Sequence, residues 1–173
     1  MNPIRRLIVI WLRLVHILSG IFWVGATLLM VVFLLPAARA GGAEGRRFLG
    51  SVFQRMGPVM GVTALLTIVS GFFLYARVSG GFQQVWVTSP TGRAYGIGAL
   101  AAILAVIVGA AVNARAGARI GALQKRLAAD SATPSAAEAA QLAGWQTRIE
   151  RGAWVVAGLL LIAAAAMATA RYL

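Results

Sequence analysis

Two ionisable side chains lie inside a long apolar stretch near the N-terminus, and they are the strongest candidates for chemistry in this sequence. Arg13 and His16 interrupt a run of mainly Leu, Ile and Val between residues 7 and 35. They are three residues apart, so a helix places both on one face. An ionisable group inside a membrane span is expensive to bury, and it is a candidate for function by default.

The same helical face continues at alternating intervals of three and four residues with polar, small or aromatic side chains. The other faces of this segment carry Ile, Leu and Val, so we expect this face to point into the protein interior. Gly20, one turn after His16, leaves room for a bound group, and Trp23 provides a flat wall. The residues of this face are Arg13, His16, Gly20, Trp23, Thr27 and Met30.

A single histidine in apolar surroundings fits several kinds of chemistry. A neutral imidazole can ligate haem iron, with Arg13 near a propionate. It can also join a proton path, or bind copper weakly together with methionine. The alternative is a buried histidine that donates to a backbone carbonyl or to a threonine on a neighbouring helix. One histidine and no cysteine exclude a zinc site with four ligands.

The composition places these residues in a membrane protein. Of the 173 residues 60% are hydrophobic and 12% are charged, and the mean hydropathy is +0.83. A soluble domain has about 45–50% apolar and about 25% charged residues. A helix of about 20 apolar residues spans the hydrocarbon core. Four segments meet this requirement, at about residues 7–35, 59–78, 95–112 and 152–170.

We therefore predict an all-α fold, an integral membrane four-helix bundle that forms a single transmembrane domain over residues 1–173. The first span is expected to stop at Pro36, and the second to begin after Pro58. The first apolar run is much longer than the 7–15 residues typical of a signal peptide, so we interpret it as a retained helix. The four acids lie outside the spans, which disfavours hydrolysis and proton-coupled transport: Glu44, Asp130, Glu138 and Glu150.

Basic residues are distributed unequally between the two ends of the predicted bundle. Connection one, residues 37–57, holds four arginines, and connection three, residues 113–151, holds six of the remaining cations. The positive-inside rule then places both connections in the cytoplasm and both termini outside the inner (plasma) membrane. Arg5 and Arg6 count against this orientation. Membrane orientation also accounts for the net charge of +12, so the expected partner is the lipid bilayer and no nucleic acid.

The connections and the helix contacts can be outlined from local patterns. Residues 46–53 space apolar side chains like an interfacial helix. Connection three first continues the third helix into water, breaks at Thr133-Pro134-Ser135, and restarts at a capping box made by Ser135 and Glu138. A short echo relates Ser19-Gly20 to Ser70-Gly71. Small residues spaced by four are expected to allow close helix contact: Thr63, Thr67 and Gly71, and Ala101, Ala105, Gly109 and Asn113.

The stretch Trp11-Leu12-Arg13-Leu14-Val15-His16-Ile17, followed by Trp23-Val24-Gly25, resembles the first helix of two related families. These are the HemJ-type protoporphyrinogen oxidases and the copper-resistance CopD-type membrane domains. The resemblance implies a four-helix membrane fold, haem b on His16, and oxidation of a porphyrinogen or electron transfer to a quinone. It covers the first helix only. The later lysine and the second histidine of the HemJ pattern have no counterpart here, and the methionines are few beside a CopD metal cluster.

The residues and the resemblance together lead to a small haem-binding, redox-active membrane protein. His16 is the expected iron ligand, Arg13 the propionate partner, and Gly20 and Trp23 the lining of the pocket. The second axial position is then empty, filled by water, or filled by His16 of a second copy in a homodimer. Two alternatives stay open: a non-catalytic accessory subunit of a larger membrane complex, and a CopD-like copper-handling domain. Whether the protein is an enzyme stays open as well.

Overall fold

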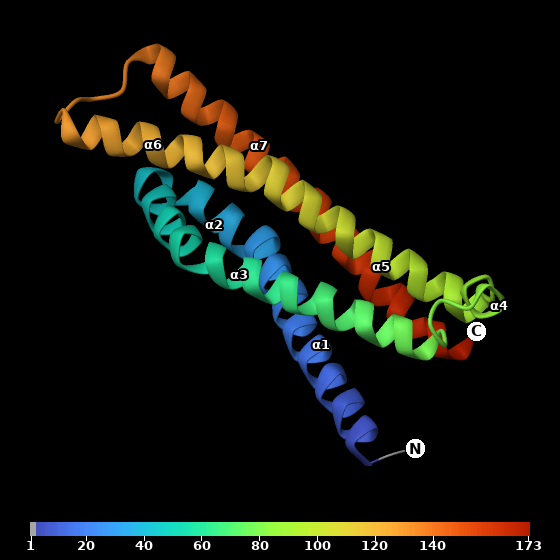
Figure 1. Ribbon diagram of the computed structural model, residues 1–173. Helices are drawn as coiled ribbons and strands as arrows, with labels where there is room; N and C mark the ends of the chain where they lie inside the picture. The colour runs from blue at the N-terminus through green and yellow to red at the C-terminus, as the bar shows by residue number, and fades with distance from the viewer. Residues whose placement is uncertain (1–2) are drawn as a thin grey trace.

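The computed structural model describes residues 3–173, and it is built from helices (Figure 1). No strand occurs within these residues, so the predicted all-α class is confirmed. The elements in chain order are α1 (Pro3–Leu29), the π-helical η1 (Met30–Leu34), α2 (Leu35–Ala40), α3 (Gly42–Val78), α4 (Gln84–Val87), α5 (Pro90–Val108), the π-helical η2 (Gly109–Ala114), α6 (Arg115–Ala129), α7 (Ala136–Thr169) and the 3₁₀ turn η3 (Ala170–Tyr172).

These elements join into four long helical rods. The first is α1–η1–α2, the second α3, the third α5–η2–α6 and the fourth α7 with η3. Each rod contains a stretch that is long and apolar enough to cross a membrane, with mean hydropathies between 2.0 and 2.4. The fold is therefore compatible with a multi-pass membrane protein.

Two prolines that were expected to end or begin a span lie inside helical rods instead. The first rod continues beyond Pro36 to Ala40. The reason is the π-helical turn just before it, where the N–H of Leu35 bonds to the carbonyl of Met30 and the widened turn accommodates a residue without N–H. Pro58 lies within α3 and removes only one donor from that helix. The predicted interfacial segment and the second span are thus one continuous helix.

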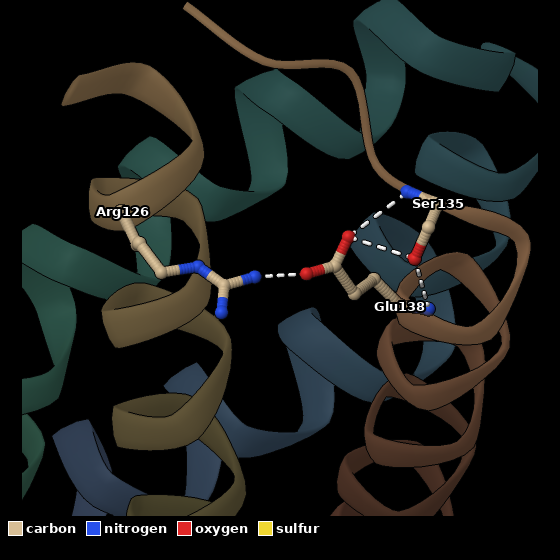
Figure 2. Close-up of polar contacts among 3 residues, drawn as sticks. All are labelled: Arg126, Ser135 and Glu138. Carbon is tan, nitrogen blue, oxygen red and sulfur yellow. Dashed lines mark hydrogen bonds and ion pairs between the residues drawn. The ribbon is translucent and has the colours of Figure 1, made fainter. Parts of the chain in front are cut away.

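Helix α7 begins where the local signal predicts, whereas α6 ends at Ala129, before the expected break at Thr133-Pro134-Ser135. The hydroxyl of Ser135 accepts from the N–H of Glu138 (3.3 Å), and the Glu138 carboxylate accepts from the N–H of Ser135 (2.9 Å), as Figure 2 shows. This is the predicted capping box. Arg126 of α6 pairs with the same carboxylate across the hairpin. The backbone hydrogen bond from Ser135, followed by its hydroxyl and by Arg126, lowers the pKa of Glu138 below its usual value.

The core is built mainly from small side chains. Helix α5 packs most extensively on α7, and α1 packs on α3. Alanine at the contact lets two helix backbones approach closely, which favours dispersion contacts in lipid as in water. The predicted ladder is confirmed at Ala101 and Ala105, which are buried. The central cluster is Trp23, Ala64, Ala101, Ala102, Ala105, Val156, Leu160 and Ala163.

The N-terminal half of α1 departs from the bundle. In Figure 1 α1 crosses α3, and its first turns extend away from the other helices. The buried residues of α1 begin only at Ser19 and continue with Trp23 and Thr27. The helix crossing therefore lies near residues 16–20, and the turns before it have only exposed or half-buried side chains.

Candidate functional site

His16 lies between α1 and α3, close to the point where the two helices cross. Its Nδ1 is 2.9 Å from the carbonyl oxygen of Thr67, and the hydroxyl oxygen of Ser70 is 3.3 Å from the same nitrogen. A carbonyl oxygen only accepts, so Nδ1 carries the proton, and in the neutral form of the ring Nε2 holds the lone pair. Within residues 3–173, no hydrogen bond reaches Nε2.

Gly71 provides the space for this ring. A Cβ at position 71 would lie 3.1 Å from Nδ1 of His16 and 2.8 Å from Cε1, and the second distance is shorter than real Cβ contacts. Gly20 is in a different situation, because a Cβ there would meet the methyl carbon of Thr67 at an ordinary 3.6 Å. The glycine that the histidine requires is therefore Gly71 of α3, and not Gly20 of its own helix.

Three buried hydroxyl groups surround the backbone contact of His16. Thr67 donates to the hydroxyl of Ser19 at 2.8 Å, and Ser19 donates to the carbonyl of Val15 in its own helix. Ser70 is 3% exposed and contacts the imidazole. Such hydroxyl contacts hold membrane helices together. We call the set His16, Ser19, Thr67 and Ser70 the His16 cluster.

Sequence reasoning identified His16 but not all of its neighbours. The sequence predicts Thr67 and Gly71 only as packing residues, and it allows either a threonine or a backbone carbonyl as the hydrogen-bond acceptor of the histidine. The structure places the Thr67 carbonyl there. Ser70 was missed as a neighbour of His16. The signal for it was the repeated Ser-Gly pair, since both pairs lie at the crossing: Ser19-Gly20 contacts Thr67, and Ser70-Gly71 contacts His16.

The other predicted site residues do not gather around the imidazole. Trp23 is buried in the central cluster, two turns beyond His16. Gly20 packs on Thr67, as described above. Thr27 and Met30 are buried, so the predicted inward face is confirmed from Trp23 onward. At Arg13 that prediction is wrong: its side chain is exposed, because α1 has already left the bundle at this turn.

His16 could supply one ligand to a metal-containing group. Within residues 3–173, no group of three or more histidine, cysteine, aspartate or glutamate side chains could hold a metal ion. A porphyrin needs only an axial ligand from the protein. A metal-ligating histidine usually donates its other ring N–H to a carbonyl or carboxylate, which fixes the ring orientation. The contact between Nδ1 and the Thr67 carbonyl meets that requirement.

A second polar side chain has a buried atom at the place where η2 packs on α7. Asn113 lies in the π-helical segment η2, and its Oδ1 is a buried acceptor without a hydrogen-bond partner among residues 3–173. It packs against Gly152 of α7, where a Cβ would be 2.5 Å from that oxygen. π-Helical turns are frequent at functional sites. The sequence indicated Asn113 as a contact residue, and that contact is confirmed.

No known protein family, curated protein or solved structure matches this chain. The resemblance of the first helix to the HemJ-type and CopD-type families therefore rests on the residues between Trp11 and Gly25 alone.

Proposed function

We propose that this chain is a multi-pass protein of the inner (plasma) membrane that binds haem b through Nε2 of His16 and takes part in electron transfer. The observation that supports the proposal is the anchored imidazole: Nδ1 donates to Thr67, and Nε2 is without a hydrogen bond in the described part of the chain. Haem would supply one-electron redox chemistry at this position.

The surroundings of His16 support this role in three ways. The Thr67 carbonyl orients the ring and increases the basicity of the free nitrogen. Gly71 lets the ring lie against the backbone of α3, so rotation of the imidazole is restricted. Arg13, one turn earlier on α1, has an exposed guanidinium group without an acidic partner among residues 3–173, and this group can meet a propionate.

The membrane placement is supported by the four rods and by the character of their outer surface. Large apolar side chains are exposed along all four rods, for example Ile21, Leu65, Leu100 and Leu161. Contiguous apolar surface of this extent requires a lipid or protein partner. In the bilayer these side chains face acyl chains.

The test is the absorption spectrum of the detergent-purified protein from a haem-replete host, beside His16→Ala and His16→Gln. Glutamine can still donate to the Thr67 carbonyl but is a poor iron ligand. We expect a Soret band in the wild type and none in either variant, with the thermal unfolding midpoint of His16→Gln close to that of the wild type. The absence of a Soret band from the wild type, or equal bands in all three proteins, would refute the haem role.

A non-catalytic subunit of a larger membrane complex is the second candidate, and one observation favours it. The N-terminal half of α1 leaves the bundle and has no buried side chain before Ser19. In this case the His16 cluster only joins α1 to α3. The expected result is then a wild type without a Soret band, and a lower unfolding midpoint for His16→Ala than for His16→Gln. A metal assay on the same preparation tests the copper-handling alternative.

A further inference from the structure

A pocket with a cationic lining lies between α6 and α7, at the end of the apolar part of these helices. Its volume is about 270 Å³. Three arginines and a tryptophan line it together with two apolar residues from the end of the third predicted span. These residues are Arg115, Arg119, Arg148, Trp145, Ala111 and Val112.

The three arginines that line the pocket come from two helices, and all three are exposed. Arg115 and Arg119 are four residues apart on α6, so they lie on one face of that helix. Arg148 reaches the same pocket from α7. Like charges that face one pocket repel each other unless an anion lies between them, so this arrangement favours a bound anion.

No acidic side chain of the described chain neutralises this pocket. The two carboxylates of α7 are engaged elsewhere: Glu138 pairs with Arg126, and Glu150 pairs with Arg39, whose Nε donates to it at 2.9 Å. Within residues 3–173, none of the three pocket arginines takes part in an ion pair. Each of these guanidinium groups has five N–H donors, which are thus available to a ligand with several oxygen acceptors.

The apolar side of the pocket indicates which anion fits. Ala111 and Val112 end the predicted third span, so on that side the pocket borders hydrocarbon. Trp145 has the amphipathic side chain that is common at the membrane–water interface. An anionic phospholipid combines a phosphate for the cationic side with acyl chains for the apolar side, and basic pockets between membrane helices bind such headgroups.

We infer that this pocket binds the phosphate headgroup of an anionic phospholipid, held by Arg115, Arg119 and Arg148 at the membrane boundary. Free phosphate shares the headgroup chemistry but has no use for the apolar wall. The inference depends on the membrane placement of the proposed function, and it does not depend on haem. His16→Ala is therefore expected to bind the lipid like the wild type.

The test is native mass spectrometry of the full-length protein in detergent, titrated separately with dioleoyl phosphatidylglycerol, dioleoyl phosphatidylcholine and inorganic phosphate. The triple variant Arg115→Gln/Arg119→Gln/Arg148→Gln removes the pocket cations. Its control, Arg46→Gln/Arg47→Gln/Arg55→Gln, removes the same charge from connection one. We expect at least about tenfold weaker phosphatidylglycerol binding for the pocket variant and less than about twofold for the control.

Each other outcome overturns the inference. Equal binding of the two lipids by the wild type excludes recognition of an anionic headgroup. Equal losses of phosphatidylglycerol binding in the pocket variant and the control indicate that the overall charge alone attracts the lipid. If inorganic phosphate competes with the lipid at equal concentration, the site is one for free phosphate. If the triple variant does not fold, Arg119→Gln is compared with Arg47→Gln, and a loss of less than about twofold is then the contradicting result.

Discussion

The imidazole of His16 occupies the space that a side chain on Gly71 would need, with only 2.8 Å between its Cε1 and the position of a Cβ on that glycine. One turn earlier on the same helix, the Thr67 carbonyl holds Nδ1 at 2.9 Å. Helix α3 thus supplies both the space and the acceptor for the one histidine of the chain. This relationship makes the orientation of the ring dependent on the crossing of α1 and α3.

Replacing Gly71 by alanine is expected to displace the imidazole and break its contact with Thr67. Overpacking of this kind costs about 1–3 kcal/mol. The control is Gly61→Ala on the same helix, where a Cβ meets nothing within 4 Å, and alanine there adds up to about 1 kcal/mol of helix stability. In detergent, the thermal unfolding midpoint should be lower than that of the wild type for Gly71→Ala and higher for Gly61→Ala. Equal midpoints would show that the ring is not confined by Gly71.

The contact between η2 and α7 is expected to be equally sensitive to an added side chain. In Gly152→Ala the new Cβ would lie 2.5 Å from Oδ1 of Asn113 and 3.0 Å from Cγ1 of Val112, so these side chains must shift or the helices must separate. Overpacking of this kind costs about 1–3 kcal/mol. Gly158→Ala, where a Cβ meets nothing within 4 Å, is the matched control.

A double variant tests whether the contact with Asn113 causes the loss of stability expected for Gly152→Ala. Asn113→Ala removes the oxygen that the new Cβ meets, so it should restore part of the stability that Gly152→Ala loses. The unfolding midpoints of the two single variants and the double variant form a thermodynamic cycle. Additive losses would mean that Asn113 and Gly152 do not interact.

The orientation of the protein in the membrane can be determined by labelling introduced cysteines, because the chain has no cysteine of its own. Ser51 is exposed in the part of α3 that belongs to connection one, and Gln83 is exposed between α3 and α4. A membrane-impermeant thiol reagent added to whole cells should label Gln83→Cys and leave Ser51→Cys unlabelled until the cells are opened. The reverse pattern would invert the predicted orientation and leave the fold unchanged.

The start of α7 is expected to lose stability in acid. The pKa of Glu138 is lowered from its ordinary 4.5, first by the backbone N–H of Ser135, so the folded cap binds a proton less tightly than the unfolded chain. Its stabilising contribution is therefore present above pH 4.5 and is lost as the pH falls through the lower pKa of the folded state. The protection factors of the amides in the first turn of α7, taken relative to the intrinsic exchange rate at each pH, should fall in that range.

Two variants check the origin of this pH dependence. Glu138→Gln keeps the shape of the side chain but removes the charge, so exchange in this turn should be faster than in the wild type at neutral pH and less dependent on acid. Glu44→Gln changes a carboxylate at the start of a different helix, and it should leave the exchange of α7 as it is. An unaltered pH profile in Glu138→Gln would contradict the assignment.

The features that follow from neighbours along the chain were predictable from the sequence. Apolar stretches long enough for a span, the Ser135–Glu138 cap and the alanine ladder at residues 101 and 105 depend on spacing within one helix, and the structure has them. The identification of His16 is of the same kind, because a lone ionisable ring in an apolar helix is visible in the sequence itself.

The features that depend on how helices cross were decided only by the tertiary structure. Arg13 shares a helical face with His16, yet it is exposed, because α1 leaves α3 at that level. Ser70 and Gly71 lie beside the imidazole although more than fifty residues separate them from it in the chain. Pro36 lies within a rod because a π-helical turn precedes it. Periodicity determines which residues share a face, whereas the crossing point of two helices determines how much of that face is covered.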